Sequence, residues 1–238
     1  MTKILVWDIP ARLLHWGFAA SLTAALGIGL LVDDEQPLFQ LHMVFGIIAL
    51  FLLAVRVVLG LVGSRYSRFT SFPLRPGEVV RYAVSAVTAK TKLYAGNNPG
   101  SALAAVLMFL LVPALFVTGV GWGGAAWEEL HEALAWALFA VIAVHLLGLA
   151  WHTLRHRENI SLAMVTGRKA GPPEDAISSA HAAWGMVVVI GAGLWIAALV
   201  ASHNASTATL QLPGIGVKLQ LGENDSSHGQ PDHNHDRD

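Results

Sequence analysis

The chain has 238 residues, of which 54% are hydrophobic and only 13% are charged, and its formal net charge is −1. A soluble domain carries about twice that share of charged residues, so the composition excludes an ordinary soluble globular protein. Cysteine is absent, which excludes disulfides, thiolate metal sites and cysteine nucleophiles.

Five apolar runs are each about as long as the roughly 20 residues that cross a bilayer as a helix. None of them alternates polar and apolar residues as a transmembrane strand would. We therefore predict an all-α polytopic membrane protein with spans at residues 13–32, 39–63, 101–121, 128–153 and 181–202. The first run is too long for a signal peptide and no small-residue cleavage site follows it, so we expect it to be retained.

Lysine and arginine precede the first span and fill the second and fourth connections between spans. The first and third connections, DDEQP (33–37) and GWGGAAWEE (121–129), carry no basic residue. Because Lys and Arg favour the cytoplasmic side of a membrane, we predict a cytoplasmic N-terminus and a periplasmic C-terminus in a bacterial inner membrane.

The chain divides into three parts. Residues 1–169 are expected to form a four-helix transmembrane core, residues 170–202 a linker and fifth transmembrane helix, and residues 203–238 a polar periplasmic tail. The end of the tail, GENDSSHGQPDHNHDRD, has the composition of a disordered segment. The preceding piece, TLQLPGIGVKLQL, could form a short hairpin or lie against the membrane surface.

Four of the eleven histidines lie inside spans in a pattern of two pairs. His131 and His145 lie on one helix, where fourteen residues rise roughly 21 Å and return to within about 40° of the same face. The topology places His42 at the outer level with His131, and His15 toward the inner level with His145. Ionisable groups within a bilayer are costly and indicate function by default.

Two facing imidazoles in an apolar bundle suit the iron of a haem, which is a large flat apolar cofactor. Zinc would require about four close ligands, and no carboxylate or cysteine accompanies either pair. Gly17, Gly46 and Gly148 could leave room for such a disc, or could simply allow close helix packing. A single histidine is explained as well by an interhelical hydrogen bond, but the set of four favours two haem sites.

The depth of His15 does not match this pairing well. It lies only three residues after Arg12, whereas His145 lies ten residues before Arg155, so the two depths differ unless the first helix starts earlier or tilts. A helix capped by Asp8, with a proline in its first turn, would reduce the difference.

The other histidines have simpler interpretations. His152 is the alternative partner of His15, and otherwise it and His156 are expected at the inner interface. His181 opens the fifth span without an evident partner. The tail histidines could bind a metal loosely, although solvated disorder is the simpler interpretation of His228, His233 and His235.

Arg56 is a charged residue inside the second span, fourteen residues past His42 and near the depth of the inner pair. It could bind a haem propionate through its bidentate fork, or it could extend to the inner interface, and both interpretations stay open. Arg12, three residues before His15 on the helix, is a second candidate for a propionate.

Several segments resemble the bacterial cytochrome b561 family, which includes the b-type cytochrome subunits of nickel-iron hydrogenases. The resemblance spans residues 4–169 and is carried by VWDIPARLLHWGF, HMVFG with VRVVLG, NNPGSALAA and HEALAWALFAVIAVHLLG…LRHRENISLAMVTGRK. It implies two haem b groups in a four-helix core, with His15 and His145 on the inner haem and His42 and His131 on the outer one. The fifth span and the tail lie outside the shared core.

The expected function is therefore electron transfer across the inner membrane by a dihaem b-type cytochrome. The partners would be membrane lipid, quinone or quinol, and a periplasmic redox protein such as a c-type cytochrome or a hydrogenase; no nucleic acid is expected. Whether the chain acts with that partner as a quinone oxidoreductase stays open.

Two alternatives belong to other classes of protein. One is a multi-pass transporter or proton-relay protein that uses the same histidines as titrating groups, although the chain shows no internal repeat of the kind found in many transporters. The other is a metal-handling membrane protein, suggested by the histidine-rich tail.

Overall fold

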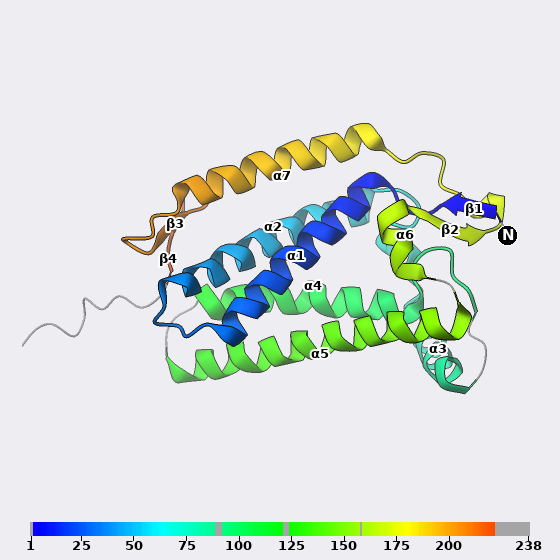
Figure 1. The fold of residues 1–238 in the computed structure, drawn as a ribbon, viewed down its shortest axis with the longest axis horizontal. Helices are drawn as coiled ribbons and strands as arrows, with labels where there is room; N and C mark the ends of the chain where they lie inside the picture. The colour runs from blue at the N-terminus through cyan, green and yellow to red at the C-terminus, as the bar shows by residue number, and fades with distance from the viewer. Residues whose placement is uncertain (1, 89–91, 121–123, 158, 222–238) are drawn as a thin grey trace, which may run out of the picture.

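The computed structural model describes residues 2–88, 92–120, 124–157 and 159–221. Five helices of this described part are long and apolar enough to cross a membrane, and Figure 1 shows them running along the long axis of the molecule. They are α1 (Ile9–Leu31), α2 (Gln40–Val62), α4 (Pro99–Val120), α5 (Ala125–His156) and α7 (Ala182–Ser202). The predicted all-α polytopic class and the five spans are confirmed.

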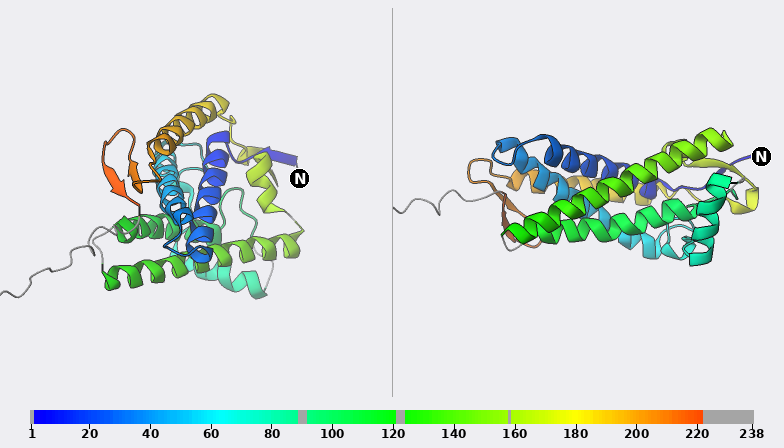
Figure 2. Two further views of the ribbon diagram at one scale, coloured as in Figure 1. Left: turned by 60° about the vertical axis from the view of Figure 1, so that its left-hand side comes forward. Right: turned by 90° about the horizontal axis from the view of Figure 1, so that it is seen from below.

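The first four of these helices form two packed pairs. Helix α1 packs against α2, α4 packs against α5, and α2 also contacts α4 (Figures 1 and 2). A buried apolar cluster joins the two pairs and consists of Leu22, Ala49, Leu53, Val112 and Leu138. Helix α7 contacts α1 and α2 on the side away from α4 and α5, so it is added to the outside of a four-helix unit.

Helix α1 begins at the Asp8 cap that would bring His15 closer in depth to His145. The carboxylate of Asp8 accepts a hydrogen bond from the backbone N–H of Ala11 at 2.8 Å, and Pro10 lies in the first turn. The hydroxyl of Ser67 donates to the other carboxylate oxygen at 3.4 Å. Asp8 is only 1% exposed, so the cap is buried, and α1 starts four residues before the predicted span.

A small sheet and a short helix lie at the same end of the bundle as the N-terminus. Strand β1 (Thr2–Leu5) pairs antiparallel with β2 (Arg168–Gly171), and α6 (Ile160–Thr166) lies just before β2. The side chain of Asn159 caps α6 by accepting from the N–H of Leu162 at 3.1 Å, and Gly167 ends it with a φ of 77°. No pattern in the sequence predicted these elements.

Helix α3 (Pro76–Thr88) crosses the ends of the long helices and was also not predicted (Figure 2). The indole N–H of Trp151 on α5 donates to the carbonyl of Ala86 at 2.8 Å and fixes α3 to the bundle. Val80, Val84 and Val87 are exposed at helical spacing, a pattern typical of a helix that lies in a membrane interface.

The opposite end of the molecule carries a hairpin formed by β3 (Thr209–Gln211) and β4 (Lys218–Gln220). Leu210 and Leu221 are buried in one apolar cluster with Leu199 of α7 and with residues of α2. Of the two structures considered for this piece, the hairpin is therefore the one observed. Residues 222–238, which include the expected disorder and the three tail histidines, lie outside the described residues.

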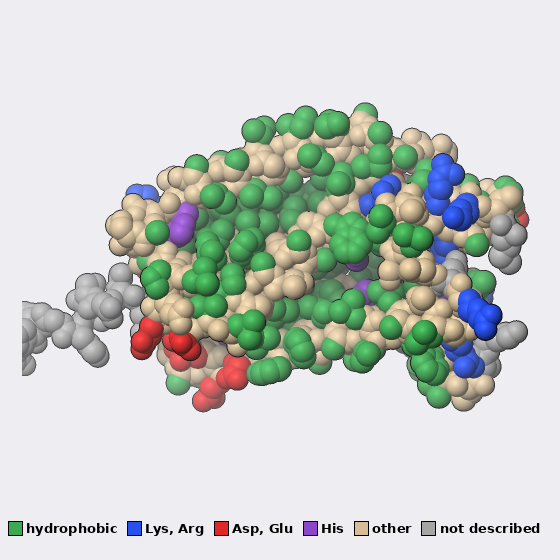
Figure 3. All heavy atoms as spheres, in the orientation of Figure 1, with side chains coloured by type: hydrophobic (Ala, Val, Ile, Leu, Met, Phe, Trp, Pro, Cys, Tyr) green, Lys and Arg blue, Asp and Glu red, His purple; other side chains and the backbone are tan. Residues whose placement is uncertain are grey.

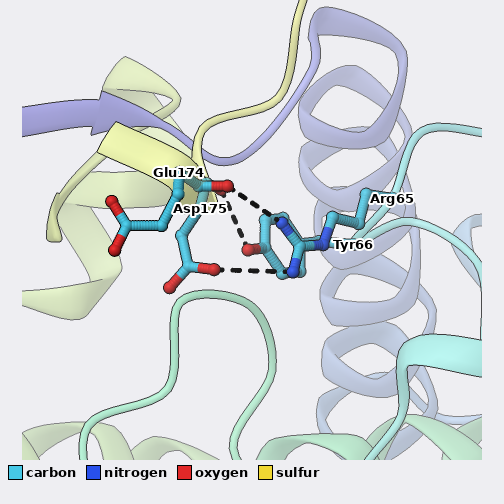
Figure 4. Close-up of polar contacts among 4 residues, drawn as sticks. All are labelled: Arg65, Tyr66, Glu174 and Asp175. Carbon is cyan, nitrogen blue, oxygen red and sulfur yellow. Dashed lines mark hydrogen bonds and ion pairs between the residues drawn. The ribbon is translucent and has the colours of Figure 1, made fainter. Parts of the chain in front are cut away.

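The connections contain three short 3₁₀ helices, η1 (Pro37–Phe39), η2 (Phe69–Ser71) and η3 (Pro173–Asp175). Figure 4 shows how η3 binds the loop that follows α2. The guanidinium of Arg65 lies 3.4 Å from the Asp175 carboxylate and donates to the carbonyl of Glu174. The hydroxyl of Tyr66 donates to the carbonyl of Asp175 at 2.9 Å, and burial raises the pKa of Tyr66 so that this proton is retained.

Charged side chains divide between the two ends of the bundle. Figure 3 shows most of the Lys and Arg side chains at the end that carries β1, and a group of Asp and Glu side chains at the opposite end. Lys218 on the hairpin is an exposed exception. The basic and acidic residues that alternate between connections along the chain therefore gather at opposite ends of the bundle.

Replacement of the buried cap should destabilise the protein. Loss of an N-cap acceptor costs about 1 kcal/mol, which lowers the melting temperature of a chain of this size by roughly 2–4 °C. We expect this decrease for Asp8→Ala, and a smaller one for Asp8→Asn, which keeps an acceptor oxygen. The exposed Asp34→Ala is the matched control, and equal melting temperatures for Asp8→Ala and this control would contradict the role of the cap.

Candidate functional site

The structure brings the two histidines of the outer pair together and places those of the inner pair within range of each other's charge. His42 on α2 and His131 on α5 have ring centroids 6.1 Å apart, with an angle of 72° between the ring planes. His15 on α1 interacts electrostatically with His145 on α5. All four imidazoles are half-buried, and Figure 3 shows histidine side chains in a hollow between α1 and α5. Their role as ligands remains a prediction.

In the outer pair, one ring nitrogen of each histidine is already hydrogen-bonded. The Nδ1 of His42 donates to the carbonyl of Ala25 at 2.8 Å. The Nδ1 of His131 lies 3.0 Å from the hydroxyl oxygen of Thr118, a hydroxyl that also lies near the carbonyls of Ala114 and Leu115. Such a bond fixes the tautomer and leaves the other nitrogen available as a ligand. Neither Nε2 has a hydrogen-bond partner in the described part of the chain.

In the inner pair, the imidazole nitrogens of His15 and His145 make no hydrogen bond to any residue that the structure describes. The ring of His15 meets the indole of the adjacent Trp16 edge-on at 5.4 Å between centroids. Buried polar groups normally have a partner. Two half-buried imidazoles at one level without protein partners therefore fit a site for a ligand.

The three glycines near the histidines differ in what surrounds them. A Cβ atom on Gly17 would lie 3.2 Å from Leu52, so this glycine allows close packing of α1 on α2. A Cβ atom on Gly46 or Gly148 would meet nothing within 4 Å. The close-packing interpretation therefore holds for Gly17 alone, and the other two glycines border open space.

Arg56 has a buried donor without an acceptor. Its guanidinium carbon lies 5.8 Å from the ring centroids of both Phe69 and Phe109, and its Nη1 is sealed from solvent and has no hydrogen-bond partner. Cation–π contacts replace only part of the hydration that a guanidinium loses. Arg56 interacts electrostatically with the buried carboxylate of Asp8 and with His15, so it lies at the inner level, and its unpaired Nη1 is the atom left for a further anionic group.

Arg12 contributes to a structural contact. Its Nη2 donates to the carbonyl of Val165, and the indole N–H of Trp16 donates to Met164 at 3.1 Å, so α1 binds the C-terminal end of α6. The Nε of Arg12 is buried without a partner and is the atom left for a second anionic group.

The remaining histidines lie in several environments. His152 is 6% exposed and lies beside His156, with 4.5 Å between ring centroids, so it is buried and not exposed at the interface. His181 is the N-cap residue of α7. His203 was not singled out from the sequence, because it follows the last span in a polar segment, yet its Nε2 lies 3.0 Å from the side-chain oxygen of Gln40. Among the described residues, no cluster of three or more metal-binding side chains is present.

The family model of prokaryotic cytochrome b561 matches residues 6–167, more than half of the chain. The chain belongs to the prokaryotic cytochrome b561 family. The cytochrome is therefore a multi-pass membrane protein that binds b-type haem and transfers electrons across the membrane. All four paired histidines lie within the matched residues, whereas α7 and the hairpin follow them. No curated protein and no solved structure matches the chain.

Thr118 offers a test of how the outer histidine is oriented. Thr118→Val keeps the volume of the side chain but removes the hydroxyl that is hydrogen-bonded to the Nδ1 of His131. Loss of such a hydrogen bond typically weakens metal binding by about 10–100-fold, so we expect a lower haem b content in the purified variant. The control is Thr153→Val, because that hydroxyl bonds only the carbonyl of Leu149 in its own helix. Equal haem contents would contradict the proposed orientation.

Proposed function

We propose that the cytochrome binds two b haems and transfers electrons between quinone and a periplasmic redox protein, such as a c-type cytochrome or a hydrogenase. In this proposal His15 and His145 hold the inner haem, and His42 and His131 hold the outer one. The observation that carries it is the presence of two imidazole pairs at two levels of one helix, α5, separated by a rise of roughly 21 Å.

The outer pair supports the proposal through its ring nitrogens. The ring centroids of His42 and His131 lie 6.1 Å apart, and these two residues would hold the outer haem through their imidazole nitrogens. Both Nε2 atoms are left free by the bonds that hold Nδ1. Two such ligands complete the coordination of a haem iron, which suits electron transfer rather than oxygen binding. When bound, the two haems supply one-electron redox centres at two depths.

The inner level supports it through two unpaired guanidinium nitrogens and open space. The unpaired Nη1 of Arg56 is a donor for a propionate, and the buried Nε of Arg12 is a second one. The space beside Gly148, three residues after His145, gives room for a flat cofactor at this level, and the space beside Gly46, four residues after His42, gives room at the outer level. The chain itself fixes the direction of its imidazoles, neutralises the propionates and keeps water from the bundle interior.

We further propose that the membrane is the bacterial inner membrane, with the N-terminus in the cytoplasm and the C-terminus in the periplasm. The gathering of Lys and Arg at the β1 end supports this orientation. The outer pair would then lie near the hairpin, on the side of the periplasmic partner. The match to residues 6–167, and the position of α7 outside the four-helix unit, support a core of residues 1–169 followed by an added helix and tail. The family match also favours this function over a transporter or proton-relay protein.

The test is the haem content of the purified protein and of single histidine variants. We expect two haem b groups per chain, with the sharp visible bands of low-spin haem after reduction with dithionite. His131→Ala and His145→Ala should each remove about one haem, because each breaks one proposed pair. His203→Ala, which removes a histidine bonded to Gln40 at the hairpin end, should keep both haems. Two haems in both ligand variants would refute the assignment.

Two neighbouring glycines of α1 provide a second, milder test. A Cβ atom on Gly29 would lie 2.8 Å from the Nδ1 of His42, whereas one on Gly27 would meet nothing within 4 Å. Gly29→Ala should therefore displace the His42 ring and reduce occupancy of the outer haem, and Gly27→Ala should not. The two variants are compared by their haem content and their visible spectra. Identical spectra would show that the position of His42 is not constrained in this way.

A further inference from the structure

We infer that the protein binds one anionic phospholipid through its phosphate group in a cavity between the end of α2 and the start of α7. The cavity has a volume of about 370 Å³, and its polar lining comes from Ser64, Arg65, Arg68, Ser178 and His181. This site is separate from the histidine pairs and does not depend on the proposed haem ligands.

The cavity is rich in unused donors. The guanidinium of Arg68, the hydroxyl of Ser178 and the imidazole of His181 make no hydrogen bond or ion pair within the described part of the chain. Arg65 lines the cavity too and is held from one side by Asp175 at 3.4 Å. Such an exposed pair is weak, so Arg65 can also turn toward an anion.

No carboxylate is among the described residues that line the cavity. The two nearest acids belong to η3, where Asp175 pairs with Arg65, and Figure 4 shows the carboxylate of Glu174 pointing away from that arginine. Two arginines without a lining acid favour an anionic group, and the guanidinium fork matches the oxygens of a phosphate.

The position of the cavity favours a lipid over a free anion. Helix α2 ends at Val62 and α7 begins at Ala182, so the cavity lies at the level where the membrane-spanning helices meet the headgroup region. The adjoining turns expose large apolar side chains, with Leu61 and Trp184 each 67% exposed and Val62 77% exposed. Acyl chains can cover this surface while basic side chains hold the headgroup, whereas free phosphate would leave it uncovered.

The cavity is built from the segment that the family model matches and from the segment that follows it. Ser64 to Arg68 belong to the segment matched by the family model, whereas Ser178 and His181 lie beyond its end at residue 167. A lipid bound there contacts the four-helix core and the added helix together. The fifth helix is therefore held to the core partly by a lipid of the inner leaflet.

The experiment is native mass spectrometry of the full-length protein in detergent, with phosphatidylglycerol, phosphatidylcholine or inorganic phosphate added separately. We expect one phosphatidylglycerol to stay bound and to be preferred over phosphatidylcholine. Arg68→Gln should reduce the bound fraction about tenfold, as loss of one charged hydrogen bond does. Arg168→Gln is the control, because this exposed arginine of β2 does not line the cavity. Unchanged size-exclusion profiles and haem spectra show that the variants are folded.

Two results would overturn the inference. Equal retention of phosphatidylglycerol by the Arg68→Gln variant and the parent would exclude the cavity as the site. Equal retention of the two lipids, or complete displacement of phosphatidylglycerol by millimolar inorganic phosphate, would show that the cavity does not select an anionic lipid.

Discussion

The structure depends on one constraint, which is that a polar ring nitrogen inside an apolar bundle must have a partner. The outer histidines meet half of this requirement within the protein, since Ala25 and Thr118 bind one nitrogen of each ring. The other ring nitrogens of these histidines, and those of the inner pair, make no hydrogen bond to a described residue, and one nitrogen of Arg56 is buried without an acceptor there. A haem with two axial positions and two carboxylates supplies partners of the required kind.

Helix α5 sets the distance between the two levels of histidines. Because both His131 and His145 lie on it, the separation of the two levels follows from the rise of one helix and not from loops. The level of His15 is set instead by where α1 begins, and the buried cap at Asp8 extends α1 toward the sheet. At this end, α6 is bonded to α1 through Arg12 and Trp16, and β1, just before α1, pairs with β2, just after α6. They thus position the inner pair from outside the spans.

The sequence predicted those features that depend on long patterns. Five spans follow from apolar runs of membrane length, and the start of α1 follows from an Asp and a Pro in capping positions. The pairing of the histidines as ligands stays a prediction. The short elements could not be predicted, because β1 and β2 are four residues each and pair across most of the chain. Helix α3 was missed because its 13 residues do not form an apolar run of membrane length. The bond between His203 and Gln40 depends on how the hairpin folds back on α2, which no local pattern reveals.

The central claim is that each pair of opposed imidazoles binds its own iron. An anomalous difference map, recorded at the iron absorption edge from crystals of the intact cytochrome, tests it most directly. The account predicts two iron peaks, one between His15 and His145 and one between His42 and His131. A single peak, or an iron bound by His152 in place of His145, would contradict it.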